Sequence, residues 1–121
     1  MTKKVLIIEN DADIRNLIAF ILEEEGFAVA GMPSPEALDT IVRHQPDLIL
    51  IDEWLAGRPG HRLCLRIKLF HQLVHVPVII LSTANDIEKI VMECKADGYV
   101  RKPFDVAELV ETVQEQLVKR A

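Results

Sequence analysis

The sequence contains no apolar run near the roughly 18 residues that cross a bilayer, so a membrane-spanning chain is not expected. It has no run of lysine and arginine and a net charge of −5, which argues against a nucleic-acid surface. Cys64 and Cys94 are the only cysteines, and without a recognisable signal peptide they indicate reduced thiols in a cytoplasmic protein. The four histidines lack the spacing of metal ligands and are expected at the surface: His44, His61, His71 and His75.

Internal repeats, low-complexity segments and interdomain linkers are also missing. Hydrophobic residues make up 50% of the chain and charged residues 27%, a composition typical of a globular domain. A chain of 121 residues is long enough to bury about two thirds of its unfolded surface. We therefore expect residues 1–121 to form a single domain, either stand-alone or part of a longer protein.

The stretch 47–52 holds four consecutive large apolar residues, Leu48 to Ile51, directly before Asp52. Such an uninterrupted run is typical of a strand covered on both faces, as in a parallel sheet. Folds with parallel sheets place their chemistry at the carboxyl ends of the strands. Asp52 is therefore the first candidate for a functional residue, and because an unpaired carboxylate there is costly, other groups are expected to face it.

Strands and helices are predicted to alternate along the chain. The expected strands are 5–8, 28–30, 48–51, 76–82 and 98–101. A helix is expected after each: from Asp11 or Asp13 to Gly26, from Ser34-Pro35-Glu36 to Gln45, from His61 to His71, from Asp86, and from Asp105. The stretch 53–60 is expected to be a loop because of its glycine and proline content.

The stretch 61–71 allows two interpretations. Alternate leucines and isoleucines fit a strand, whereas Leu63, Ile67 and Phe70 have helical spacing. A helix is preferred because its residues favour helices and because parallel neighbours need a crossover connection. The last helix is expected to point these side chains inward: Val106, Leu109, Val110, Val113 and Leu117.

Five β-then-α units predict an α/β fold, a doubly wound five-stranded parallel sheet in the flavodoxin-like order 2-1-3-4-5. This order places the end of the first strand beside the end of the third, although they are far apart in sequence. Four strand ends then bring polar side chains to one edge of the sheet: Glu9, Asn10 and Asp11, then Asp52, then Ser82 and Thr83, and finally Lys102.

This pattern resembles the receiver domain of two-component response regulators, of the chemotaxis-regulator type. The resemblance extends from Lys4 to Leu117. It rests on acidic residues after the first strand, Asp after the third, Ser-Thr after the fourth and Lys-Pro after the fifth. Each feature alone has an ordinary explanation, such as a helix-start charge pair or a solvated lysine. The four features in order are specific.

The resemblance implies a role for each residue at this edge. Asp52 is the implied phosphoacceptor, assisted by Lys102 and by the hydroxyl of Ser82 or Thr83, while Ser82 and Tyr99 are the implied switch residues. Phosphoryl transfer to a carboxylate needs positioning and charge neutralisation more than acid–base catalysis. A lysine ammonium and a hydroxyl donor suit that requirement.

Mg²⁺ is the implied cofactor, because it favours carboxylate, carbonyl and water oxygens. The implied ligands are Glu9, Asn10, Asp52 and the backbone carbonyl of Trp54, with Asp11 as a further candidate. Without the metal or the lysine, like-charge repulsion would raise the pKa of one of the clustered acids.

Several residues depart from the family pattern. Asn10 stands where the family usually has aspartate, so Mg²⁺ binding is expected to be weakened but not abolished. Trp54 is placed to cover the phosphoryl group and to slow its hydrolysis. The Lys102-Pro103 bond is cis in much of this family, which the sequence does not decide. Two loop residues also differ from the family: Ala56 and Pro59.

The resemblance predicts a phosphorylation-gated switch in a phosphorelay, not an enzyme beyond its own phosphorylation and dephosphorylation. A histidine kinase or phosphotransfer protein is the expected donor, and a downstream protein or attached output domain the expected target. The responding face, also a candidate homodimer interface, comprises the fourth helix, fifth strand and fifth helix, with no nucleic-acid or membrane contact expected. Its charged residues are Glu88, Lys89, Glu93, Lys95, Arg101, Glu111 and Glu115.

Two alternatives share this topology. A pseudo-receiver would be an interaction module locked in one state, which Asn10 favours and the retained Asp52, Ser82 and Lys102 oppose. A flavin carrier would need a phosphate-binding loop rich in serine and threonine after the first strand. The acidic residues within 9–13 would instead repel the phosphate of FMN, so the flavin alternative is rejected.

Overall fold

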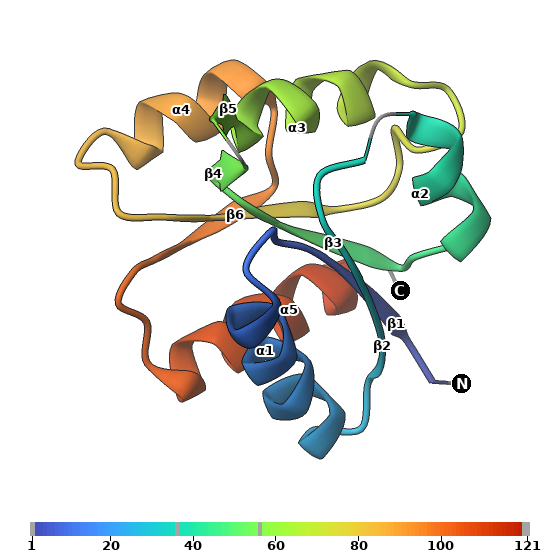
Figure 1. Cartoon of the computed structure of the whole chain (residues 1–121), viewed down its shortest axis with the longest axis vertical. Coiled ribbons are helices and arrows are strands. Elements are labelled where there is room, and N and C mark those ends of the chain that lie inside the picture. Colours follow the sequence, from blue (N-terminus) through green and yellow to red (C-terminus); the bar gives the residue numbers. More distant parts are fainter. Residues whose placement is uncertain (1, 36, 56, 120–121) are drawn as a thin grey trace.

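Parallel strands form the main sheet of the protein, whose computed structural model describes residues 2–35, 37–55 and 57–119 (Figure 1). Its order is β2-β1-β3-β6-β7, which is the predicted 2-1-3-4-5 order once a short hairpin, β4-β5, is counted separately. The strands of this sheet are β1 (Lys4–Ile8), β2 (Ala28–Met32), β3 (Leu48–Asp52), β6 (Val78–Ser82) and β7 (Gly98–Arg101).

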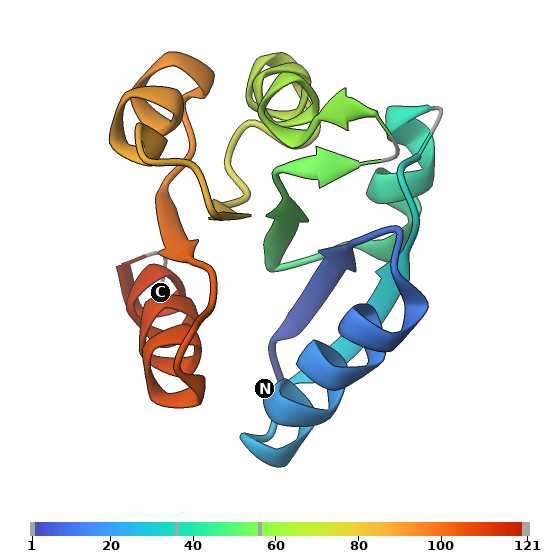
Figure 2. The same ribbon diagram turned by 60° about the vertical axis from the view of Figure 1, so that its left-hand side comes forward.

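Helices cover both faces of this sheet and confirm the doubly wound fold. They are α1 (Ala12–Glu24), α2 (Leu38–His44), α3 (Gly60–Leu69), α4 (Ile87–Cys94) and α5 (Val106–Lys119). α1 and α5 lie on one face, and α2, α3 and α4 lie on the other (Figures 1 and 2). Among the described residues, no helix is both long and apolar enough to cross a membrane.

The central strand β3 is buried along its whole length. Ile49 and Ile51 point into the core shared with α2, α3 and α4, while Leu48 and Leu50 point into the core shared with α1 and α5. Burial on both faces is the reason for the uninterrupted apolar run. Asp52 therefore ends the most enclosed strand of the sheet.

The two ends of α1 follow the sequence prediction. Asp11 is the N-cap, and its Oδ1 accepts the backbone N–H groups of Asp13 and Ile14 at 2.9 and 3.2 Å. Gly26 has a φ of 93°, a conformation that glycine adopts without strain, and it stops the helix. The turn between β1 and α1, which carries Glu9 and Asn10, is thus anchored by a capped helix.

The prediction that Ser34 caps the second helix is wrong. α2 begins at Leu38 after Ala37, which makes no side-chain capping bond. Ser34 instead donates its backbone N–H to Asn10 Oδ1 at 2.7 Å. The segment between β2 and α2 is therefore a loop that contacts the turn after β1. Glu36, which was part of the same predicted helix start, lies outside the described residues.

The predicted loop 53–60 contains a hairpin of β4 (Trp54–Leu55) and β5 (Arg58–Pro59), and its last residue, Gly60, begins α3. Two-residue strands are too short to produce a periodic signal in the sequence. Ala56 lies outside the described residues. Other predicted boundaries also shift: β2 extends to Met32, β6 begins at Val78, α3 ends at Leu69, and β1 and β3 are each one residue longer.

The predicted inward stripe of α5 is correct except at its start. Leu109, Val110, Val113 and Leu117 are buried, whereas Val106 is 53% exposed. Val106 is the first residue of α5, so it precedes the part of the helix that packs against the sheet.

Candidate functional site

The carboxyl ends of the parallel strands meet at one edge of the sheet. Ile8 in β1 lies opposite Ile51 in β3. Asp52 in turn lies opposite Leu81 in β6. The residues that end or directly follow these strands are therefore neighbours, as predicted. They are Glu9, Asp52, Ser82 and Lys102.

The Asp52 side chain is 9% exposed, and both of its oxygens have partners. The Lys102 ammonium forms an ion pair with Oδ1. The backbone N–H of Trp54 donates to Oδ2 at 3.1 Å. Because 22% of the Lys102 side chain is exposed, a ligand can approach this pair from solvent.

Glu9 is a second buried carboxylate beside Asp52. Burial first, and then the negative charge of Asp52, together raise the pKa of Glu9 to about 7 against the opposing effect of Lys102. The like-charge effect that the sequence predicted for clustered acids thus contributes to the shift, but burial is its larger cause. Near neutral pH the Glu9 carboxyl is therefore protonated for part of the time.

The two residues that follow Glu9, Asn10 and Asp11, have partners away from Asp52. Asn10 Oδ1 accepts the backbone N–H of Ser34, and Asp11 Oδ1 caps α1. Arg15 Nη1 donates to the backbone carbonyl of Glu9 at 2.5 Å, which positions the turn after β1. The acids brought closest together are thus Glu9 and Asp52.

The donor set at this edge fits a magnesium ion that keeps much of its water. Mg²⁺ commonly binds one or two carboxylates and retains several waters. The raised pKa of Glu9 marks two acids with too little positive charge between them. Within residues 2–35, 37–55 and 57–119, no three acidic, histidine or cysteine side chains converge on one point. Trp54, Asn10 and water would have to complete the shell.

Ser82 is the more enclosed of the two predicted hydroxyl residues. Its side chain is buried, and its Oγ accepts the backbone N–H of Ala84 at 2.9 Å. The carbonyl of Ser82 accepts the N–H of Lys102 at 2.8 Å, which ties the end of β6 to the lysine. Thr83 is exposed. Of the two, Ser82 is therefore the hydroxyl held within the edge. The adjoining Lys102-Pro103 bond is cis.

Tyr99 is half-buried and its hydroxyl is held on the outside of α4. The hydroxyl donates to Glu88 Oε1 at 3.2 Å. Arg101 Nη2 lies 3.3 Å from the same oxygen, and its guanidinium stands 5.5 Å from the centre of the Tyr99 ring. Glu88 thus holds two side chains of β7, which directly precedes Lys102.

Gly60 is a residue whose importance sequence reasoning missed. A Cβ at this position would collide with the carbonyl oxygen of Asp52 and lie 2.9 Å from Ile51 Cγ2. The N–H of Gly60 also donates to the Glu53 carbonyl at 2.5 Å. The sequence did contain a signal for this close contact. Glycine is a poor helix former, yet Gly60 stands where a helix begins, directly after Pro59.

Of the four histidines predicted at the surface, His44 and His61 are only partly exposed. His61 has a partner. Its Nδ1 lies 2.5 Å from Glu53 Oε1, and the ring is half-buried at the start of α3. Glu53 Oε2 is buried without a hydrogen-bond partner among the described residues. No spacing rule links Glu53 to His61, because a hairpin of unpredicted shape brings them together. His71 and His75 are exposed as expected.

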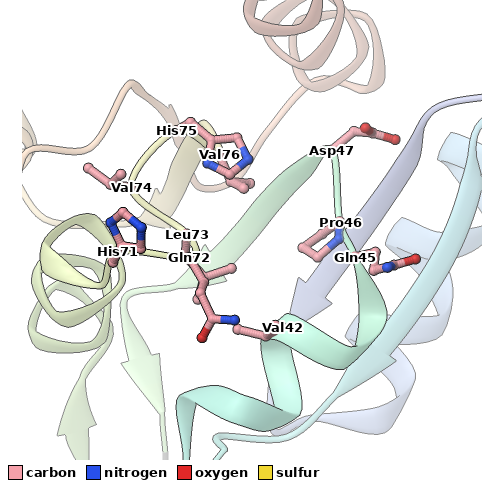
Figure 3. A pocket seen from close by; sticks show the side chains of 10 residues that line it. All are labelled: Val42, Gln45, Pro46, Asp47, His71, Gln72, Leu73, Val74, His75 and Val76. Atoms are coloured by element: carbon pink, nitrogen blue, oxygen red, sulfur yellow. The ribbon is translucent and has the colours of Figure 1, made fainter.

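A separate cavity of about 800 Å³ lies at the opposite end of the sheet, between α2 and the loop after α3 (Figure 3). His71 and His75 line it, and Gln72 extends towards Val42. Asp47 accepts the N–H of Lys4 at 2.7 Å.

A doubly wound sheet whose central strand ends in a buried aspartate paired with a lysine defines a signal-receiver domain. The chain matches the family model of the response regulator receiver domain over residues 5–114. It therefore belongs to this family, whose members are phosphoacceptors in two-component signalling, switch with phosphorylation and generally bind Mg²⁺ at the phosphorylation site.

Solved structures with a similar fold support this assignment. A protein from Chloroflexus aurantiacus J-10-fl has 27% identity and a TM-score of 0.90, covering 98% of this chain and 99% of its own. The receiver domain of a signal transduction histidine kinase from Syntrophus aciditrophicus has 27% identity and a TM-score of 0.87, covering 98% and 92%. NtrX from Brucella abortus has 30% identity and a TM-score of 0.85; the match covers 99% of this chain but only 28% of NtrX.

Proposed function

We propose that Asp52 accepts a phosphoryl group from the phosphohistidine of a histidine kinase or phosphotransfer protein. The main support is the ion pair between Asp52 and Lys102 at an edge where a second acid, Glu9, is also buried. A carboxylate with a fixed cation and a fixed N–H donor is positioned for transfer, which depends mainly on placement and charge neutralisation.

In the proposed step, a carboxylate oxygen of Asp52 attacks the phosphorus atom. An O–P bond forms, the N–P bond of the donor breaks, and its electron pair returns to the imidazole nitrogen. The N–H of Trp54 holds one carboxylate oxygen, while Lys102 exchanges Asp52 for a phosphoryl oxygen. Mg²⁺, bound by Glu9 and Asp52 with Asn10 and the Trp54 carbonyl, would supply further positive charge.

The proposed switch uses Ser82 and Tyr99. Ser82 Oγ, an acceptor from Ala84 in this structure, would turn to donate to the phosphoryl group. Tyr99 would then leave Glu88 and turn inward, which changes the face formed by α4, β7 and α5. That face is the proposed docking site for a downstream protein, an attached output domain or a second copy of the chain.

The lifetime of the proposed phosphorylated form would be set by the domain itself. Trp54 is 64% exposed in the hairpin that follows Asp52. An indole there is placed to cover the phosphoryl group against water. Dephosphorylation would then be slow and would need no separate active site.

Phosphorylation is tested by incubating the chain with acetyl phosphate and Mg²⁺ and locating the modification by mass spectrometry. We expect one phosphoryl group, on Asp52, and its loss in Asp52→Asn, because the amide is not a nucleophile. The control Asp86→Asn, at an exposed position before α4, should be phosphorylated like the wild type. Modification of another residue in the wild-type chain would refute the assignment.

The pseudo-receiver remains the second candidate, because the Asn10 amide oxygen is occupied by the Ser34 N–H. A module of that kind would show no acetyl phosphate adduct and no change on titration with beryllofluoride. Either response would reject it in favour of phosphorylation-dependent switching.

A further inference from the structure

The two cysteines of the chain meet between α3 and α4, which lie side by side on one face of the sheet (Figures 1 and 2). Cys64 Sγ lies 3.4 Å from the carbonyl oxygen of Cys94. The Cys94 Sγ lies 3.8 Å from the carbonyl oxygen of Val91, one turn earlier in α4. Both side chains are buried, and neither forms a disulfide. The thiols are therefore neighbours from two different helices, at positions 64 and 94.

The surroundings of the two sulfurs differ. A hydrogen-bonding interaction with the Cys64 side chain lowers the pKa of Cys94 to about 7 despite its burial, and the backbone of Ala96 and the charge of His61 act in the same direction. The same hydrogen bond and burial raise the pKa of Cys64. Cys94 is therefore the thiol that ionises first, and Cys64 is the protonated neighbour beside it.

Paired thiols of this kind match the arrangement of a reactive and a resolving cysteine. A nucleophilic thiolate reacts first with an oxidant, and an adjacent thiol then displaces the oxidised group. Two buried cysteines in identical surroundings would have equal pKa values, whereas these two thiols differ. The contact across α3 and α4, not the acidity of one group, makes a second step within the same molecule feasible.

We propose that Cys64 and Cys94 are a peroxide-oxidisable pair that closes into an intramolecular disulfide between α3 and α4. First, the Cys94 thiolate attacks one oxygen of hydrogen peroxide, an S–O bond forms, the O–O bond breaks and hydroxide leaves. Next, the Cys64 sulfur attacks the Cys94 sulfur, the S–S bond forms, the S–O bond breaks and water leaves with the thiol proton. The two thiols lose two electrons, and the peroxide gains them.

This inference goes beyond the proposed phosphoryl transfer, since neither cysteine contacts Asp52, Glu9 or Lys102 in the contacts described above. The cross-link would tie the last turn of α4 to α3. Because α4 carries Glu88, the partner of Tyr99 and Arg101, oxidation would restrain the helix that borders the proposed responding face.

The wild-type chain tests the pair directly. The folded protein is treated with hydrogen peroxide, denatured, alkylated with N-ethylmaleimide and mapped by mass spectrometry without reduction. We expect both alkylation sites to be lost in step, a peptide cross-link between positions 64 and 94 to appear, and dithiothreitol to reverse it. Full alkylation of both thiols, cross-links only between molecules, or oxidation no faster than global unfolding would overturn the proposal.

Single variants test the order of the steps. In Cys64→Ser, which keeps a hydroxyl donor beside Cys94, the reaction should stop at the sulfenic acid of Cys94, which dimedone captures. In Cys94→Ala, Cys64 should form no dimedone adduct over the same time. Equal capture in both variants, or capture only at Cys64, would overturn the assigned roles. Thermal melting curves check that each variant folds, and the wild-type cross-link stands as a measurement independent of both.

Discussion

Asn10 presents a neutral amide at the turn where Glu9 and Asp52 face each other. Its Oδ1 accepts the N–H of Ser34 at 2.7 Å, a bond that a carboxylate at the same position would also accept. An amide oxygen adds no formal charge to a cation site, and a carboxylate adds one. The affinity for Mg²⁺ is therefore the property in which this residue matters most.

We predict that Asn10→Asp strengthens Mg²⁺ binding by about ten- to a hundredfold, since a close opposite charge is worth a few kcal/mol near a protein surface. Trp54 is the single tryptophan, and its backbone N–H donates to Asp52 Oδ2. Its fluorescence therefore reports a titration at this edge of the sheet. Gln114→Glu in α5 makes the same change in charge at an exposed position and should leave the affinity unchanged. Equal affinities for wild type and Asn10→Asp would show that residue 10 does not contact the ion.

At this scale, sequence reasoning could predict which residues meet but not how their side chains turn. Glu9, Asp52 and Lys102 come together because strand order alone places the ends of β1, β3 and β7 near one another. The orientation of Asn10 depends on the loop that carries Ser34, whose shape no local periodicity describes. The contact of Tyr99 with Glu88 likewise depends on how α4 sits against β7.

The elements around the site are joined by backbone contact as well as by side chains. The start of α3 touches the end of β3 at Gly60, where any side chain would meet the Asp52 carbonyl oxygen. The hairpin β4-β5 lies between Glu53 and Gly60, and the Gly60 N–H donates to the Glu53 carbonyl. This bond holds the start of α3 against the end of β3. The placement of Asp52 therefore depends on a helix that contributes no side chain to it.

We predict that Gly60→Ala lowers the free energy of unfolding by about 1–3 kcal/mol, the usual result of forcing an extra carbon into a packed site. It should also slow phosphorylation by acetyl phosphate, because relief of the collision moves Asp52. Urea denaturation and mass spectrometry measure the two effects. The control is Gly98→Ala, whose added carbon would make only ordinary contact, its nearest neighbour being Gln116 Nε2 at 3.4 Å. A Gly60→Ala protein as stable and as reactive as the wild type would contradict the close packing.

The helix α5 was predicted well because its apolar residues repeat with a clear period, and β3 because its uninterrupted apolar run is distinctive. The hairpin β4-β5 and the start of α2 were missed for the opposite reason. Two-residue strands have no period, and the Ser34-Pro35 pair carries a helix-start signal that is overridden when the Ser34 N–H bonds to Asn10 instead. Tertiary contacts decided both cases.

For the whole molecule, the acidic edge makes stability depend on pH. Glu9 is 4% exposed, and its pKa rises from 4.5 to about 7 on folding. The folded chain therefore holds more protons than the unfolded chain between these values, so the stabilising effect of the proton is lost as pH rises.

We predict that, without Mg²⁺, the free energy of unfolding falls between pH 4.5 and about 7 by up to about 3 kcal/mol from this group. Glu9→Gln should flatten that part of the profile, because glutamine does not titrate. Glu111→Gln, at an exposed position in α5, should retain the wild-type dependence. The measurement is chemical denaturation at a series of pH values. A Glu9→Gln profile that still falls as steeply as the wild type would place the titrating group elsewhere.

The position of β7 at the end of the sheet has a mechanical consequence. β3 is bonded to strands on both sides, whereas β7 is bonded to β6 alone. Asp52 is thus carried by the most restrained part of the backbone, and its counter-ion Lys102 by one of the least restrained. Any adjustment to new charge at this edge will displace the lysine side of the molecule, with Tyr99 and Arg101 beside it, while the aspartate stays in place.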